Sequence, residues 1–240
     1  TGEPGMAEPL VLLPGMMCDA RAFAPQIEAL SPRSTVVLAP ITQGERIEEI
    51  ASGLLDQLPQ RFALVGQGMG GVVALELLRR APDRISRIAL LATHVLAELP
   101  AIAADREPQI VMAQSGKLRE AMQSRMASGF LAPGVGRAEV LTRAMEMAET
   151  LGGDVFVRQS RALQRRRDQQ AVLRKCRVPA LVLCGEHDAL CPVKRHAFMA
   201  EMIPYAKLTV LEDAGHMPSL EQPEATTAAL RDWMQQPLAL

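Results

Sequence analysis

Residues 62–80 have the sequence FALVGQGMGGVVALELLRR. The apolar run Phe62–Val65 is typical of a buried strand, and Val72–Arg80 is apolar nearly all round, as is a helix packed deep against a sheet. Glycines at positions 66, 68, 70 and 71 occupy the short turn between the two. This strand, turn and helix predict the central unit of a parallel sheet.

Short apolar runs alternate with segments of helical period on both sides of this unit. The helical segments include Arg46–Leu58 and Val72–Arg80. The runs that we interpret as buried strands are Leu10–Leu13, Thr35–Ala39, Phe62–Val65, Ile85–Leu91, Ala180–Cys184 and Leu208–Leu211. This alternation predicts an α/β fold, with a mostly parallel sheet of about six or more strands covered by helices on both faces.

The strand signal stops between Leu91 and Val178, where the sequence becomes rich in Ala, Met, Arg and Gln. We expect a helical insertion there, within a single domain that spans residues 6–240. A chain of 240 residues is long enough for one well-buried domain and short for two. Residues 1–5, which precede Met6, are interpreted as a remnant of recombinant expression and are left out of the fold.

The charge balance bears on the kind of partner. Lys and Arg number 26 and Asp and Glu number 27, so neither nucleic acid nor an anionic membrane is an expected partner. A small-molecule substrate is expected instead. No apolar stretch approaches the roughly 20 residues of a membrane-spanning helix. The four cysteines lack the paired spacing of a disulfide scaffold, which favours reduced thiols and a cytoplasmic location.

The glycine-rich turn fits two motifs. Gly66, Gly68 and Gly71 satisfy G-x-G-x-x-G, in which glycines let a pyrophosphate approach the backbone at a helix N-terminus. That fingerprint also needs an acidic residue about 20 residues on, and the strand ending at Leu91 carries none there. The turn also fits the nucleophile elbow G-x-S-x-G, whose central residue is held in a strained conformation. Position 68 is that central residue.

An acidic residue and a histidine follow two later strands, in the order that the elbow motif requires. Asp188 comes shortly after the predicted strand Ala180–Cys184, and His216 comes shortly after Leu208–Leu211. Loops at the carboxyl ends of parallel strands form the crevice of such a fold. The two side chains are therefore candidates for one site with position 68.

With these motifs the chain resembles the α/β-hydrolase superfamily, in particular its small bacterial esterases and lipases, from Leu10 to Trp233. The resemblance rests on G-x-x-D-x-x-x-P at 185–192, on A-G-H at 214–216 followed by Glu221 and Pro223, and on the elbow at 66–71. It implies a variable helical cap at about 94–165 and no cofactor. The methionines beside the candidate site and the low aromatic content of 3% favour a small apolar acyl or alkyl ester as substrate.

The resemblance also implies a Ser-His-Asp triad, with His216 as base and then acid and Asp188 as the residue that orients it. The segment 12–16 resembles the oxyanion loop of the family. By analogy, the backbone N–H groups of Met16 and Met69 would receive the developing oxyanion.

Glycine stands where this family has its serine, and Gly68 has no atom that can attack a carbonyl. Three explanations stay open. A serine was replaced by design to give an inactive variant; the chain is a natural ligand-binding member without catalysis; or His216 activates water directly as a general base. A dinucleotide-binding oxidoreductase is a more distant alternative.

Other residues near the motifs have candidate roles in the substrate pocket. Met17, Met217 and His94 are assigned to it, the methionines because thioethers make adaptable apolar walls. Cys18 is a conceivable thiol nucleophile, although a buried structural cysteine is commoner. Four residues of types that bind zinc lie within one short segment: Cys184, His187, Asp188 and Cys191. Their spacing is not that of structural zinc sites, so no metal is expected.

Overall fold

The computed structural model describes residues 8–127 and 129–238. In this part of the chain six strands form one sheet in the order β2-β1-β3-β4-β5-β6, and every neighbouring pair is parallel. The strands are β1 (Leu10–Leu13), β2 (Val36–Leu38), β3 (Phe62–Gln67), β4 (Ile85–Leu91), β5 (Ala180–Gly185) and β6 (Ala206–Leu211). The α/β fold with a parallel sheet, predicted from the alternation of strand and helix patterns, is confirmed.

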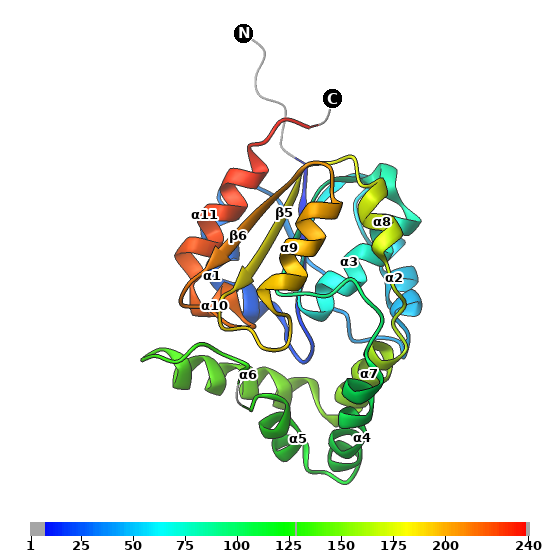
Figure 1. Cartoon of the computed structure of the whole chain (residues 1–240), viewed down its shortest axis with the longest axis vertical. Helices are drawn as coiled ribbons and strands as arrows, with labels where there is room; N and C mark the ends of the chain where they lie inside the picture. Colours follow the sequence, from blue (N-terminus) through cyan, green and yellow to red (C-terminus); the bar gives the residue numbers. More distant parts are fainter. Residues whose placement is uncertain (1–7, 128, 239–240) are drawn as a thin grey trace.

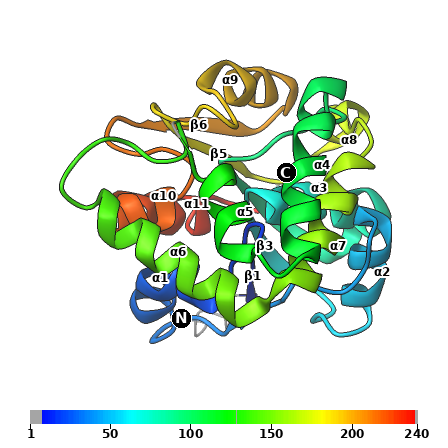
Figure 2. The same ribbon diagram turned by 90° about the horizontal axis from the view of Figure 1, so that it is seen from below.

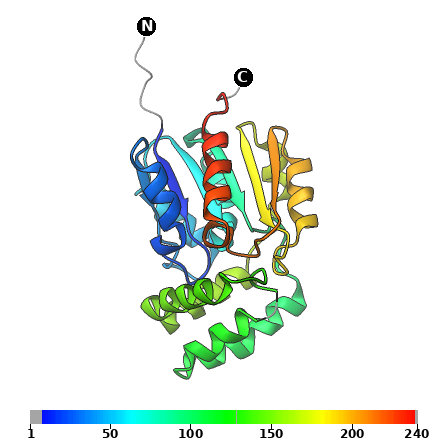
Figure 3. The same cartoon turned by 90° about the vertical axis from the view of Figure 1, so that its left-hand side faces the viewer.

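Helices cover both faces of the sheet (Figure 3). One face is covered by α1 (Ala24–Leu30) and α11 (Pro223–Met234), and the other by α2 (Ile47–Leu55), α3 (Met69–Arg80), α8 (Gln170–Lys175) and α9 (Val193–Met202). Side chains alternate between the faces, so each strand contributes to two apolar clusters. The strands β1, β3, β4 and β5 are buried along their whole length.

The two edge strands differ from the prediction that every strand is buried. β2 is half-buried, and in β6 the side chains of Leu208 and Val210 are 37% and 40% exposed. Each edge strand has a neighbour on one side only, so solvent reaches it from the open side. An apolar run alone does not separate an edge strand from a central one.

Of the five α-helices between β4 and β5 in the described part of the chain, the first four form a separate layer beyond one end of the sheet (Figure 1). They are α4 (Pro100–Gln114), α5 (Leu118–Arg125), α6 (Arg137–Leu151) and α7 (Gly153–Gln164). The arrowheads of β5 and β6 point toward this layer (Figure 1), which therefore faces the carboxyl ends of the strands. Seen from below, α5 and α6 lie across the ends of the central strands (Figure 2). No helix among the described residues is long and apolar enough to cross a membrane.

Candidate active site

The turn between β3 and α3 is sharp, because β3 ends at Gln67 and α3 begins at Met69. The residue between them, Gly68, has φ +56° and ψ −123°, a conformation that side-chain-bearing residues rarely adopt. Three hydrogen bonds fix it: its N–H donates to Leu91 O at 2.8 Å, and its carbonyl accepts from the Thr93 hydroxyl at 2.6 Å and from the Gly71 N–H at 3.0 Å. The geometry is that of a nucleophile elbow.

The other glycines of the turn are required by packing within the protein. A Cβ on Gly66 would collide with the carbonyl of Gly70, and a Cβ on Gly70 would collide with the carbonyl of Leu13. A Cβ on Gly71 would collide with the Thr93 side chain. These positions therefore accommodate neighbouring atoms of this chain rather than a pyrophosphate, which removes the basis for the dinucleotide-binding interpretation.

Position 68 faces the candidate histidine. An ideal Cβ built on Gly68 would lie 3.4 Å from Nε2 of His216, 3.6 Å from Cα of Gly15 and 3.9 Å from the carbonyl oxygen of Ala92. All three distances are ordinary van der Waals contacts. A small side chain at position 68 therefore has room, and it would project toward the imidazole.

The candidate acid and histidine are in direct contact. Nδ1 of His216 lies 2.9 Å from Oδ2 of Asp188, and both side chains are buried. The other carboxylate oxygen, Oδ1, accepts from the N–H groups of Leu190 and Cys191 at 2.9 Å each. Burial alone would raise the pKa of Asp188, but the charge and hydrogen bond of His216 and the Cys191 N–H outweigh it and lower the pKa.

The loop that carries His216 is held by Glu221, a residue whose part in the site sequence reasoning did not specify. Its Oε2 accepts from the N–H groups of Gly215 and Met217 at 2.9 Å each, on either side of His216. Its Oε1 accepts from Ala132 N at 2.8 Å and so ties this loop to the segment before α6. The pKa of Glu221 is raised, because the effect of burial exceeds that of the three N–H donors, which lower the pKa.

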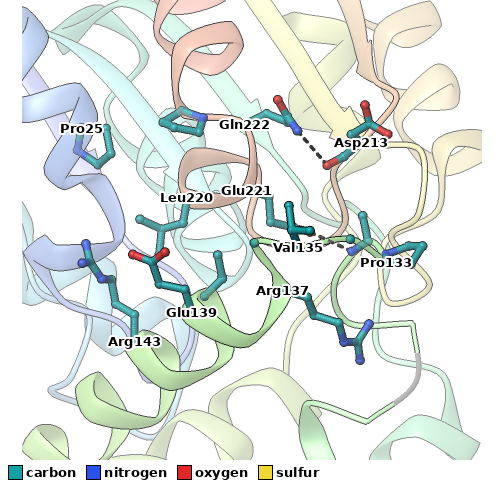
Figure 4. A pocket seen from close by; sticks show the side chains of 15 residues that line it. Pro25, Pro133, Val135, Arg137, Glu139, Arg143, Asp213, Leu220, Glu221 and Gln222 are labelled. Atoms are coloured by element: carbon teal, nitrogen blue, oxygen red, sulfur yellow. Dashed lines mark hydrogen bonds between the residues drawn. The ribbon is translucent and has the colours of Figure 1, made fainter.

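A surface groove of about 570 Å³ lies on the outer side of Glu221, between the segment before α6 and the start of α11 (Figure 4). In it, the Gln222 amide donates to the carbonyl oxygen of Asp213 at 3.1 Å. Neither Gly68 nor His216 lines this groove.

The loop after β1 lies beside the elbow, since Cα of Gly15 is one of the nearest atoms to a Cβ on Gly68. The sequence predicts that the N–H groups of Met16 and Met69 serve an oxyanion. Within the described residues, neither N–H donates a hydrogen bond to another protein group. Both donors are thus available to a ligand oxygen.

A cavity of about 510 Å³ opens onto both Gly68 and His216. His94 lines it, as expected, and its Nε2 lies 2.7 Å from the carbonyl oxygen of Leu190. Burial and then the charge of Arg166 lower the pKa of His94 to about 4, so this imidazole is neutral at physiological pH.

The methionines near the motifs are not equally placed. Met69 lines the cavity, whereas Met17 and Met217 are absent from the described residues that line it. Met17 is fully buried, with its N–H donating to the Gln159 side chain, and Met217 donates to Glu221. The structure therefore places these two in the packing around the site and not in the wall of the cavity.

The cysteines near the site do not fit the role of nucleophile or of metal ligand. Burial raises the pKa of the Cys18 thiol to about 12, which opposes a role as nucleophile. Cys191, Asp188 and His216 have possible metal-ligand atoms within 4.8 Å of one another. Burial raises the pKa of Cys191 well above its usual value, however, and Asp188 is already hydrogen-bonded to His216. A protonated thiol and a paired carboxylate fit an acid–histidine pair better than a metal centre.

The chain matches the family model described as the alpha/beta hydrolase family over residues 10–230. It therefore belongs to the α/β-hydrolase family. Among curated relatives, a pimeloyl-[acyl-carrier protein] methyl ester esterase of Neisseria meningitidis is 27% identical over 223 residues, covering 88% of this chain and 86% of the relative.

Two solved structures have nearly the same fold. An esterase from Thermogutta terrifontis superposes with a TM-score of 0.87 at 25% identity, covering 96% of this chain and 90% of the esterase. An enol-lactonase from Burkholderia xenovorans LB400 gives a TM-score of 0.85 at 23% identity, covering 98% of this chain and 94% of the lactonase. The second similarity shows the fold alone.

Proposed function

We propose that this fold is built for hydrolysis of small carboxylic esters by two-step acyl transfer, with a serine at position 68 as the nucleophile. The observation that carries the proposal is the 3.4 Å between Nε2 of His216 and a Cβ built on Gly68. A hydroxyl attached there lies within reach of the imidazole that must remove its proton. The curated esterase relative supports ester hydrolysis as the reaction class.

With a serine at position 68, each step of the reaction has a group in place. Nε2 of His216 takes the serine proton during attack and returns it to the leaving alcohol. Asp188 accepts a hydrogen bond from the Nδ1–H of His216, which fixes the imidazole tautomer and stabilises the imidazolium that forms. The N–H groups of Met16 and Met69 stabilise the tetrahedral oxyanion, and water then releases the acid by the same steps in reverse.

Gly68 leaves this chain without the nucleophile, so we propose that it binds esters without forming an acyl-enzyme. The rest of the machinery supports a parent enzyme with serine here, because the Asp188–His216 pair has the geometry of a working pair. Glycine also adopts the elbow conformation without a steric penalty, so its presence keeps the turn intact. The available function is ligand binding in the cavity beside His216.

The substitution Gly68→Ser tests the proposal, with Gly68→Ala as the matched control. On a short-chain p-nitrophenyl ester, Gly68→Ser should exceed this chain in kcat/KM by at least about a hundredfold, because it restores a covalent nucleophile. Gly68→Ala adds the Cβ without the hydroxyl and should stay at the level of glycine. A folded Gly68→Ser variant with no gain would overturn the hydrolase proposal in favour of a binding protein.

A further inference from the structure

The cavity that joins Gly68 and His216 has more basic than acidic side chains in its wall. Two acidic side chains line it against five basic ones. The acidic residues are Glu98 and Asp105, and the basic residues are Arg106, Arg125, Arg166, Lys194 and Arg195. An excess of positive charge in a concave site attracts anions.

Two of the arginines are already neutralised in part by one buried carboxylate. Oε1 of Glu98 accepts from both Arg106 and Arg166 at 2.8 Å, and Oε2 accepts from Arg106 at 2.8 Å. The Glu98 side chain is fully buried. This cluster stabilises the wall of the cavity, and both of its guanidinium groups already have a carboxylate partner.

Arg125 is in a different position. It is the last residue of α5, it is partly buried, and within residues 8–127 and 129–238 its side chain makes no ion pair and no hydrogen bond. Its guanidinium carbon lies 5.8 Å from the centre of the Phe130 ring, and that ring lies 5.5 Å from the ring of His216. The contact with Phe130 thus holds a guanidinium that has no direct carboxylate partner near the reacting end of the cavity.

Arg125 stays charged at physiological pH. Burial, and then the charge of Arg106, lower the pKa of Arg125 to about 10, still far above neutrality. A guanidinium withdrawn from water without a carboxylate partner is unfavourable, and proteins ordinarily pair such groups. Arginine also presents a planar fork of donors that matches a carboxylate.

The geometry points to Arg125 as the subsite for a carboxylate on the ligand, so that the site takes small esters carrying a free carboxylate, such as half-esters of short dicarboxylic acids. This inference rests on the proposed ester-binding function and narrows its substrate class. A cavity of about 510 Å³ accommodates a molecule of that size. The apolar ester expected from the sequence is replaced by one with an anionic end.

Binding to this chain itself is the first test, because Gly68 prevents turnover through a covalent intermediate. Isothermal titration is performed with the monomethyl esters of succinic, glutaric and adipic acid, and with their neutral dimethyl esters. At least one monomethyl ester should bind about 10- to 100-fold more tightly than its dimethyl ester, the range expected for hydrogen bonds between charged groups. Equal affinities, or no binding of any monomethyl ester, would overturn the subsite.

Arg125→Gln should abolish this preference, and Arg125→Lys should retain part of it. The matched control is Arg119→Gln on the same helix, where Arg119 is 60% exposed, pairs with Glu149 and does not line the cavity. This control should bind both ester classes as the unsubstituted chain does. A preference that survives in Arg125→Gln places the anion elsewhere and refutes the assignment.

Turnover by Gly68→Ser separates this inference from the proposed function. If Gly68→Ser hydrolyses monomethyl and dimethyl esters with equal kcat/KM, the hydrolase proposal stands and the carboxylate subsite fails. If Gly68→Ser hydrolyses neither, while monomethyl esters bind with dependence on Arg125, the subsite stands and the hydrolase proposal fails. Both stand when kcat/KM favours the monomethyl ester and Arg125→Gln removes that preference.

Discussion

Nε2 of His216 is the nearest atom outside the adjoining residues to the point where Gly68 would carry a Cβ, at 3.4 Å. The two residues are 148 positions apart in the chain, and separate strand-to-loop junctions bring them together. The contact is close enough for a serine hydroxyl to reach the imidazole, yet it leaves the Cβ itself unhindered. Any penalty for a side chain at position 68 must therefore come from the backbone.

That penalty is the first prediction. Because φ at Gly68 is +56° with ψ −123°, Gly68→Ala and Gly68→Ser should lower the free energy of unfolding by about 1–3 kcal/mol. Thermal or urea unfolding measures the loss. Restored activity in Gly68→Ser is thus expected together with reduced stability.

In the control for this prediction, a glycine-to-alanine substitution should raise the free energy of unfolding instead of lowering it. Gly53 lies exposed in α2, and a Cβ there meets no atom within 4 Å. Gly53→Ala should raise the free energy of unfolding by about 0.5–1 kcal/mol, because alanine favours the helix and reduces the entropy of the unfolded chain. Equal stability of the Gly68 and Gly68→Ala proteins would contradict backbone strain at the elbow.

The second prediction concerns the orientation of His216. In a Gly68→Ser background, Asp188→Asn should lower kcat by about 10³- to 10⁴-fold, since an amide in place of Oδ2 favours the wrong imidazole tautomer. Asparagine keeps an acceptor for the N–H groups of Leu190 and Cys191, so the fold should persist. Steady-state kinetics and circular dichroism measure the two effects. A folded variant with undiminished kcat would show that Asp188 does not orient the histidine.

Much of the core fold is predictable from local patterns because strands and helices of a parallel sheet have distinct periods. The run Phe62–Val65 and the turn at 66–71 are sufficient to indicate a central strand and an elbow, and the structure has both. The exposure of Leu208 is not predictable in this way, since strand order depends on long-range pairing. The other edge strand, β2, with the sequence VVL, is as apolar as the central strand β1, with the sequence LVLL.

A site residue is predictable from the sequence only where it follows shortly after a predicted strand. Asp188 and His216 meet that condition, and the structure brings them into contact. Glu98 and Arg125 come from the helical insertion, whose packing against the cavity has no short sequence signature. Their roles require the three-dimensional distances between charges. The segment from Ala214 through Glu221 does contain a signal for Glu221, although the sequence alone does not reveal its three backbone donors.

The third prediction tests Glu221 as a positioning residue. Glu221→Gln replaces one accepting oxygen by a donor and removes the charge, so at least one N–H among Ala132, Gly215 and Met217 loses its partner. We expect a loss of about 1–3 kcal/mol in the free energy of unfolding. In a Gly68→Ser background kcat should fall more than KM rises, because His216 is displaced from the serine.

Glu212→Gln is the matched control for Glu221, because Glu212 is exposed just before the same loop. It should leave stability and the kinetic constants within error of the parent protein. A Glu221→Gln variant that loses stability but keeps kcat would show that Glu221 supports the fold without positioning His216.

The last prediction is a pH dependence of stability that arises away from the site. Glu76 in α3 is nearly fully buried and accepts from Arg79, Arg80 and Gln169. Burial would raise the pKa of Glu76, but hydrogen bonds from the two arginines and the glutamine outweigh it and lower the pKa to about 2. Because the folded-state pKa lies below the unfolded-state value of 4.5, Glu76 stabilises the fold fully above pH 4.5 and loses this effect as the pH falls toward 2. The full contribution at neutral pH is on the order of 3 kcal/mol.

Glu76→Gln should therefore be less stable than the parent protein at pH 7, by an amount of that order. The difference should shrink to roughly two-fifths of its neutral value by pH 3, because the parent protein has lost more than half of the contribution by then. Urea unfolding at a series of pH values measures both curves. Glu201→Gln, at an exposed position of α9 without an ion pair among the described residues, should run parallel to the parent curve. A constant difference between Glu76→Gln and the parent from pH 7 to pH 3 would show that ionisation of Glu76 is not the cause.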